Sequence, residues 1–218
     1  MDETLIHCID DLENEQPDVI LSIPFPNGEL VQAGINIRPY AIECLKEANK
    51  KYQVAVFTAS HKFYADEVLN YLDPKRELIH YRLYRDSCFQ TEDGVYIQDL
   101  RIIQNRTLKD VVIVDNAVYS FGFQLDNGIP IIPFYNNRED EELLHLMNYI
   151  NTLAFFEDLR EQNAKAFQLR ELENADISDY LEYFFGQQDT NSNNKQPASV
   201  IQEEENESEQ KQSNTSNS

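Results

Sequence analysis

Tryptophan is absent from the 218 residues, and glycine, cysteine and methionine are scarce, with six, three and two copies. The cysteines, Cys8, Cys44 and Cys88, are odd in number, and no pair has the Cys-x-x-Cys spacing. This argues against a disulfide framework and against a zinc site, so we interpret them as free thiols in a reducing compartment.

Positive charge is also scarce, because 18 Lys and Arg residues face 39 Asp and Glu residues, for a net charge of −21. Such a chain lacks the basic face that neutralises nucleic-acid phosphates, and we expect no direct nucleic-acid partner. An acidic protein that binds a phosphorylated target must instead gather its few cations locally.

Long apolar runs are missing as well. None approaches the roughly 18 residues that cross a bilayer, and Asp2 and Glu3 do not suit a signal peptide. We expect no membrane segment in this chain and a location in the nucleus or cytoplasm. Hydrophobic residues still make up 41% of the sequence, which is enough for a sizeable core.

One change in composition divides the chain. Residues 187–218 are dominated by Gln, Asn, Ser and Glu, and such a segment cannot bury enough apolar area to offset its ordering entropy. We predict a folded domain over residues 1–186 and a disordered acidic tail over 187–218.

Short apolar segments bounded by turn residues alternate with amphipathic ones in the folded part. They predict strands at 19–23, 30–37, 54–57, 79–84, 111–114 and 129–132, a hairpin about 89–97, helices at 39–51 and 61–72, and a helical stretch at 139–185 in two or three pieces. This alternation indicates an α/β domain with a parallel sheet flanked by helices. Sites in such sheets lie at the carboxyl ends of the strands, which here carry the polar stretches 2–4, 58–60 and 115–116.

Five ordered segments carry a family resemblance. They are Asp2-Glu3-Thr4-Leu5-Ile6-His7, Phe57-Thr58-Ala59-Ser60 with Tyr64-Ala65-Asp66, Arg82-Leu83-Tyr84-Arg85-Asp86-Ser87-Cys88, Val112-Ile113-Val114-Asp115-Asn116, and Phe134-Tyr135-Asn136-Asn137. Together they resemble the haloacid-dehalogenase superfamily, in the form of the small phosphatases of the RNA polymerase II C-terminal domain, the NLI-interacting-factor-like family. The resemblance runs from residue 2 to about residue 150.

The resemblance implies a magnesium-dependent phosphatase of phosphoserine or phosphothreonine proteins that works through an aspartyl-phosphate. It implies a haloacid-dehalogenase-like parallel sheet with helices on both faces and a small β insertion, here residues 19–37. A phosphorylated protein or peptide would be the partner. Nothing in the sequence indicates the oligomeric state or the physiological substrate.

The site residues follow from the matched positions. Asp2 matches the general acid and base, with its backbone carbonyl facing magnesium, and Thr58 matches the residue that binds phosphate. Asn116 matches a magnesium ligand, and Asp115 would lie beside it, orienting waters or a cation. The substrate would be contacted by two further side chains and by the residue at the position of the family's lysine. These are Tyr64, Arg85 and Gln98.

Two departures from the family pattern stand out. The nucleophilic aspartate is expected two residues before Asp2, and neither it nor the first central strand of the sheet is in the chain as given; a start further upstream would supply both. Gln98 replaces a lysine and carries no charge, so it forms no ion pair with Asp115. Arg85 or Arg101 could compensate from nearby.

Simpler interpretations remain beside these. Thr58 or Ser60 could cap the following helix, Asp115-Asn116 could be an ordinary turn, and Tyr64 could be a core aromatic. Three functions stay open: an active phosphatase, a catalytically dead phosphopeptide-binding pseudophosphatase, and a mitochondrial inner-membrane translocase subunit with the same type of domain.

Overall fold

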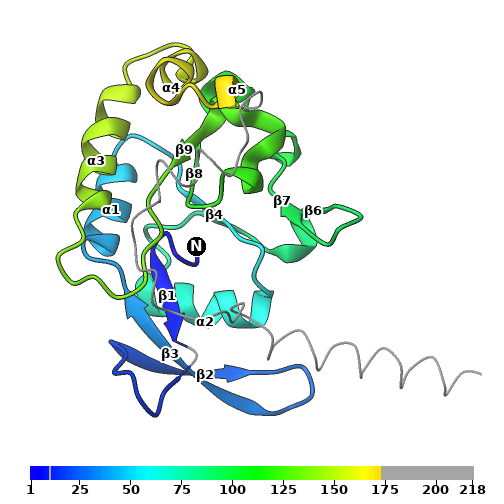
Figure 1. Ribbon diagram of the computed structural model, residues 1–218, viewed down its shortest axis with the longest axis vertical. Coiled ribbons are helices and arrows are strands. Elements are labelled where there is room, and N and C mark those ends of the chain that lie inside the picture. The colour runs from blue at the N-terminus through cyan, green and yellow to red at the C-terminus, as the bar shows by residue number, and fades with distance from the viewer. Residues whose placement is uncertain (10, 173–218) are drawn as a thin grey trace, which may run out of the picture. The chain divides into compact units, whose positions relative to one another are not determined.

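The computed structural model describes residues 1–9 and 11–172. The predicted tail, the predicted boundary at residue 186 and the end of the last predicted helix lie outside the described residues. In chain order the elements are β1 (Ile6–Ile9), β2 (Val19–Pro24), β3 (Leu30–Ile37), α1 (Ala41–Ala48), β4 (Ala55–Phe57), α2 (Lys62–Leu72), β5 (Tyr81–Leu83), β6 (Phe89–Gln90), β7 (Tyr96–Ile97), β8 (Ile113–Asp115), β9 (Gly128–Pro130), α3 (Glu142–Leu153), α4 (Leu159–Phe167) and α5 (Leu169–Leu172), with short 3-10 segments between them (Figure 1).

The predicted insertion forms an antiparallel sheet in the order β1-β3-β2. β2 and β3 are paired from Val19–Ile35 to Pro24–Leu30, and β1 adds to the other edge of β3, with Ile6 opposite Ile37. β1 was not predicted from the sequence. The sheet packs one face on α2, where Ile23 and Ile35 join a cluster that includes Leu69, and Figure 1 shows α2 lying along this sheet.

Two further pairs of strands are parallel, as the α/β pattern predicts. β4 pairs with β5, and β8 pairs with β9. Within residues 1–9 and 11–172 no strand joins the two pairs into one sheet. The hydrophobic core is correspondingly divided, since Val56 of β4 and Ile113 of β8 belong to separate clusters.

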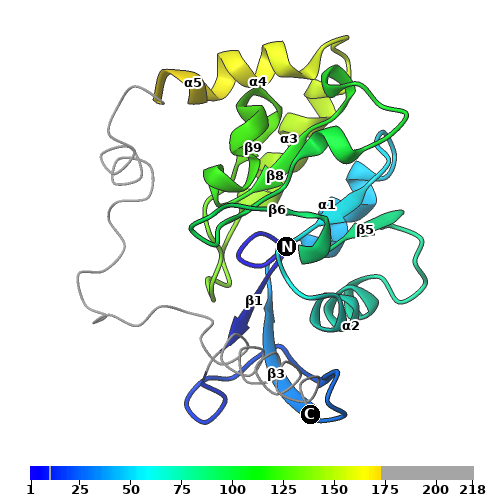
Figure 2. The same cartoon turned by 90° about the vertical axis from the view of Figure 1, so that its right-hand side faces the viewer.

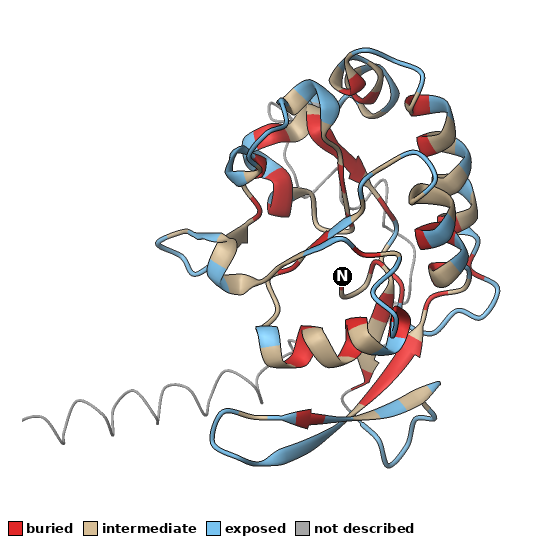
Figure 3. Ribbon diagram, turned by 180° about the vertical axis from the view of Figure 1, so that it is seen from behind, coloured by how far each residue is buried: buried red, intermediate tan, exposed pale blue. Residues whose placement is uncertain are grey.

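Helices α1 and α3 lie side by side (Figures 1 and 2), in contact through a cluster that includes Ala41, Cys44 and Leu143. Their buried residues face inward and their exposed residues face solvent (Figure 3), as expected for amphipathic helices. The helical stretch 139–185, predicted in two or three pieces, forms three helices over its described part, α3, α4 and α5.

Arg38 follows β3 and closes the structure around the N-terminal segment. Its guanidinium is fully buried and binds Asp140 through two hydrogen bonds, from Nε to Oδ1 at 2.7 Å and from Nη2 to Oδ2 at 2.9 Å. Nη1 donates to the carbonyl oxygens of Thr4 at 3.2 Å and Glu3 at 3.4 Å. One buried cation therefore fixes residues 3 and 4 to the segment that precedes α3.

Candidate functional site

Three polar stretches predicted at strand ends come together in space. The Ser60 hydroxyl donates to Asp2 Oδ2 at 2.7 Å, and the Thr4 hydroxyl donates to Asn116 Oδ1 at 3.2 Å. Ser60 follows β4 and Asn116 follows β8, so residues 2–4 bridge the carboxyl ends of these two strands. Figures 1 and 2 both show the N-terminus between α2 and the β8–β9 pair.

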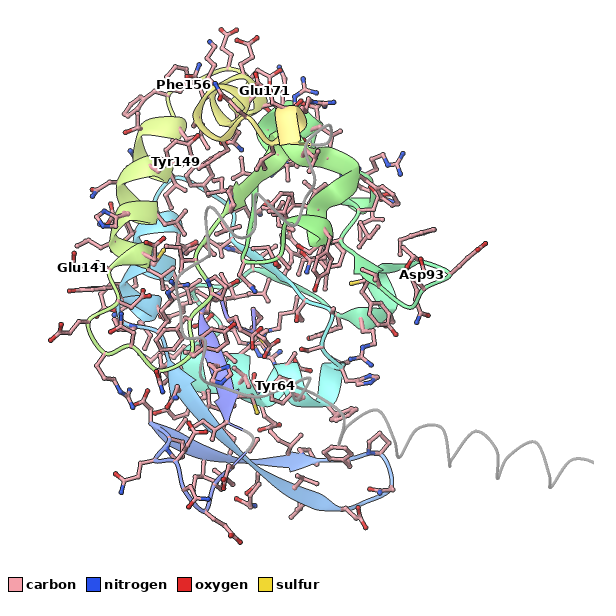
Figure 4. The ribbon with its side chains drawn as sticks, in the orientation of Figure 1. Tyr64, Asp93, Glu141, Tyr149, Phe156 and Glu171 are labelled. Atoms are coloured by element: carbon pink, nitrogen blue, oxygen red, sulfur yellow. The ribbon has the colours of Figure 1, made fainter. Side chains whose placement is uncertain are left out.

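Both oxygens of the Asp2 carboxylate have donors. The Ser60 hydroxyl donates to Oδ2, and the Tyr64 hydroxyl donates to Oδ1 at 2.9 Å. Tyr64 lies in α2 (Figure 4) and is 7% exposed. Burial, followed by the nearby Asp2 charge, raises the pKa of Tyr64 well above its usual value, so it stays a donor. The predicted groove residue thus also holds the predicted acid and base.

Thr58 is buried directly after β4. Its N–H donates to the carbonyl oxygen of Leu83 in β5, and its hydroxyl oxygen accepts from the N–H of Ser60 at 3.1 Å. The helix that follows has His61 as its N-cap, without a side-chain capping bond. Neither Thr58 nor Ser60 therefore caps α2, and the Thr58 hydroxyl keeps its own hydrogen for an incoming acceptor.

Asp115 is the last residue of β8, and its side chain is buried. Oδ1 accepts from the Ala117 N–H at 2.8 Å, and Oδ2 lies 3.5 Å from Gln98 Nε2, at the limit of a hydrogen bond. Gln98 is also buried, and its Oε1 has no partner among the described residues. Within that same part of the chain no ion pair involves Asp115. The Gln98 amide is thus the side chain nearest to Asp115 Oδ2 among the hydrogen-bond partners of the described residues.

The two arginines considered as substitutes for the missing lysine have other partners. Arg85 Nε donates to the carbonyl oxygen of Ala59 at 2.6 Å, and its guanidinium stacks over Tyr96 at 5.0 Å. Arg101 is held by Asp99, with 2.6 Å between Nη2 and Oδ2. Arg85 therefore flanks the segment 58–60, whereas Arg101 is committed to an exposed ion pair.

Sequence reasoning missed several residues around this site. Thr4 and Ser60 were within the polar stretches, but their partners Asn116 and Asp2 could not be read from spacing. Tyr119 lies in the 3-10 segment Val118–Asn127 that follows β8, and its side chain is exposed. The sequence signal that could have indicated Tyr119 is its position four residues after Asp115, which ends β8.

The described residues contain no group of three or more His, Cys, Asp and Glu side chains that could hold a metal ion. Magnesium does not require such a group, because it takes one or two carboxylates together with waters and substrate oxygens. Asp115 and Asn116 offer the hard oxygen donors that it prefers. The carboxylate of Asp2 is already engaged by Ser60 and Tyr64, which leaves its backbone carbonyl for such a role.

Comparison with known proteins identifies the class. The sequence profile of the NLI interacting factor-like phosphatases matches residues 1–160. This chain belongs to that family.

Named relatives agree with this assignment. The chain is 42% identical over 172 residues to CTD small phosphatase-like protein 2 of Dictyostelium discoideum, covering 79% of this chain and 30% of that protein. It is 36% identical to CTD small phosphatase-like protein 3 of Caenorhabditis elegans, covering 78% and 58%. It is 33% identical to CTD nuclear envelope phosphatase 1 of Xenopus tropicalis, covering 73% and 67%. The chain thus spans less than two thirds of the first two relatives.

The fold matches that of solved structures. Fcp1, described as an essential RNA polymerase II CTD phosphatase, superimposes with a TM-score of 0.54 at 18% identity, over 88% of this chain and 54% of the other. The fission yeast Fcp1 variant R271A bound to beryllium fluoride gives 0.50 at 18% identity, over 86% and 65%. The predicted α/β, haloacid-dehalogenase-like fold with a β insertion is confirmed. Among the described residues no helix is both long and apolar enough to span a membrane.

Proposed function

We propose that this chain is a phosphatase-family domain for phosphoserine or phosphothreonine proteins, and that the phosphate binds where residues 2–4 cross the ends of β4 and β8. The convergence of Asp2, Thr58 and Asn116, from segments far apart in the sequence, carries the proposal. The free hydrogen of Thr58 and the flanking guanidinium of Arg85 suit the oxygens of a phosphate group. A phosphorylated protein or peptide is the corresponding partner.

The chemistry proposed for the family form is a two-step transfer. A carboxylate two residues before Asp2 attacks phosphorus, the bond to the serine or threonine oxygen breaks, and Asp2 gives that oxygen its proton. Asp2 then takes a proton from water, which attacks phosphorus, and the carboxylate leaves as inorganic phosphate forms.

Magnesium is the proposed cofactor, held by Asp115, Asn116 and the backbone carbonyl of Asp2. The buried Asp115 supports this assignment, because a carboxylate that is 6% exposed and has no described cationic partner favours a bound cation. The ion would neutralise phosphate charge that otherwise repels an attacking carboxylate.

A second candidate function is phosphopeptide binding without turnover. Gln98 favours it, because an uncharged amide cannot offset the extra negative charge of the transition state. Such a pseudophosphatase would keep Thr58 and Arg85 for ground-state binding. Of the three relatives above none is named as a translocase subunit, and the mitochondrial alternative has no support beyond the resemblance. The relative named for the nuclear envelope supports a proposed location in the nucleus or cytoplasm.

The test compares a fluorescent serine-phosphorylated peptide with its unphosphorylated twin, with magnesium present, in anisotropy and phosphate-release assays. Thr58→Val should weaken binding of the phosphorylated peptide about tenfold, since a charge-assisted hydrogen bond is lost. Thr58→Ser, which keeps the hydroxyl, is the matched control. Equal binding of the two peptides would reject a phosphate site. Binding with release supports the enzyme, and binding without release supports the pseudophosphatase.

A further inference from the structure

Two buried oxygen atoms beside Asp115 lack the hydrogen bonds that burial normally requires. Gln98 is 3% exposed and Ser120 is 5% exposed, and neither Gln98 Oε1 nor Ser120 Oγ has a partner among the described residues. Asp115 itself is buried and has no ion-pair partner in that part of the chain. Because buried polar groups in proteins nearly always have a partner, each exception indicates a functional group, a water or an ion.

The three side chains belong to one closed loop of hydrogen bonds. The N–H of Gln98, the residue after β7, donates to the carbonyl oxygen of Ser120 at 2.6 Å. The N–H of Ser120 donates to the carbonyl oxygen of Ala117 at 2.9 Å, and the N–H of Ala117 donates to Asp115 Oδ1 at 2.8 Å. Gln98 Nε2, which lies 3.5 Å from Asp115 Oδ2, completes the loop. The chain after β7 and the chain after β8 therefore hold these side chains together.

The side-chain oxygens of this loop suit a cation. The Asp115 carboxylate and Gln98 Oε1 can only accept, and the Ser120 hydroxyl oxygen has lone pairs as well. A half-turn of the Gln98 amide exchanges its oxygen and nitrogen, so the oxygen can face Asp115 when a cation lies between them. Water would satisfy the two unpartnered oxygens, but it would leave the buried carboxylate without a counter-charge, which is costly.

The charges indicate an ion of charge +1. One carboxylate and two neutral oxygens are balanced by a single positive charge, whereas a divalent ion would leave one buried charge in excess. Magnesium at its proposed position beside Asn116 does not remove the need, because it is matched by a phosphate group, which carries about −1.5 to −2 charges at neutral pH. Neighbouring oxygens in a magnesium octahedron lie about 2.9 Å apart, and the 3.5 Å between Asp115 Oδ2 and the Gln98 amide suits a larger ion.

We propose that Asp115, Gln98 and Ser120 form a binding site for a monovalent cation of the size of sodium or potassium. Its ligands are Asp115 Oδ2, Gln98 Oε1 and Ser120 Oγ, whereas Asn116 and the backbone carbonyl of Asp2 stay with magnesium. The cation supplies the positive charge that the Gln98 amide lacks. The site itself depends only on these three side chains, and its effect on phosphate binding rests on the proposed function.

Thermal unfolding of the full chain, without peptide and with EDTA to remove divalent ions, tests for the site. N-methylglucamine chloride, whose cation is too large to enter, is replaced stepwise by potassium or sodium chloride at constant ionic strength. The Tm should rise to a plateau with potassium or sodium, because an ion that binds only the folded chain stabilises it. The salt that reaches half of the plateau at the lower concentration identifies the ion.

Variants of the ligands locate the ion. Gln98→Met removes the amide oxygen, and Gln98→Lys brings an ammonium group to Asp115 that competes with the ion, so both should raise the half-saturating concentration at least about tenfold. Ser120→Ala removes a hydroxyl ligand and should raise it about threefold. Gln104→Met is the matched control and should keep the full response, because Gln104 is exposed and lies outside the loop of hydrogen bonds.

Phosphopeptide anisotropy, with magnesium present, tests the effect on the phosphate site. At constant ionic strength, potassium or sodium in place of N-methylglucamine should strengthen binding of the phosphorylated peptide to the native chain about fivefold. The affinity of Gln98→Lys should not change between these salts, because its ammonium group already supplies the charge. The unphosphorylated twin gives the background.

Two results would overturn the cation site. They are a Tm that is equal in all three salts, and a Tm response that Gln98→Met and Gln98→Lys keep in full. A response without any change in phosphopeptide affinity would confirm the ion site and reject its role in phosphate binding. Failure of the proposed function is separate, since equal binding of the phosphorylated and unphosphorylated peptides would reject the phosphate site and leave the Tm response in place.

Discussion

At the scale of the residue, Gln98 places an uncharged amide beside Asp115 in the proposed phosphate site. Its amide lies 3.5 Å from the buried Asp115 carboxylate, and its own oxygen has no partner among the described residues. A phosphate brought to this place would meet the Asp115 carboxylate, for which no ion-pair partner lies among residues 1–9 and 11–172. The site therefore depends on an added cation or on a basic side chain in place of Gln98.

We predict that Gln98→Lys strengthens binding of the phosphorylated peptide about tenfold. A lysine there can pair with Asp115 and reach the phosphate, and a hydrogen bond to a charged group contributes about 1.5–3 kcal/mol. Gln98→Met, similar in size and uncharged, is the control. Equal affinities for the lysine and methionine variants in the anisotropy assay would contradict the prediction.

Arg38 is the residue on which the site loop depends for its position. We predict that Arg38→Met lowers the free energy of unfolding by about 3–5 kcal/mol, because it leaves the buried Asp140 without its partner. Urea unfolding measures this loss. Arg138→Met is the matched control, since Arg138 pairs with Asp18 at the surface and such pairs contribute below about 1 kcal/mol. Similar losses in both variants would contradict the prediction.

Asp66 makes the free energy of unfolding depend on pH in the acid range. Burial alone would raise its pKa, but hydrogen bonds from Lys62, Tyr84 and Arg82 outweigh it and lower the pKa from 3.8 to about 2. The stability from these bonds is therefore present above pH 3.8 and is lost as the pH falls through about 2.

We predict that the difference in unfolding free energy between the native chain and Asp66→Asn stays constant above pH 3.8 and shrinks toward pH 2. Urea titrations at a series of pH values measure it. A difference that grows on acidification would contradict the assignment.

At the scale of the element, β9 is held close to the 3-10 segment Val118–Asn127. A Cβ added to Gly128 would clash with the buried ring of Phe121. We predict that Gly128→Ala costs about 1–3 kcal/mol of stability through overpacking. Gly122→Ala is the matched control, because nothing lies within 4 Å of its added Cβ. Urea midpoints compare the two, and equal midpoints would contradict the prediction.

The sequence predicts those elements whose signals are local. β3 is found over the predicted residues 30–37, because apolar residues there are bounded by turn residues and a proline. β1 was missed, since its four residues include His7 and Cys8 without alternation, and pairing with β3 creates it. The motifs at 58–60 and 115–116 were found at the carboxyl ends of β4 and β8, whereas residues 2–4 precede β1 and follow no strand among the described residues. The Arg38–Asp140 pair was not, because 102 positions separate its partners and no local pattern links them.

At the scale of the whole molecule, the net charge of −21 opposes the approach of any phosphorylated peptide. We predict that the association rate rises a few-fold between about 0.01 and 0.15 M salt, as the Debye length falls from about 30 to 8 Å and screens this repulsion. Stopped-flow anisotropy measures the rate. A rate that falls with salt would show that local cations such as Arg85 dominate the encounter.

The contacts that hold residues 2–4 have a consequence for synthesis on the ribosome. Thr4 bonds to a residue 112 positions away, and the arginine that binds its carbonyl is fixed by Asp140. Closing such large loops is slow. Residues 2–4 must therefore wait, without their final partners, until the chain has been synthesised as far as Asp140. During that interval chaperones and proteases have access to the segment that later completes the proposed phosphate site.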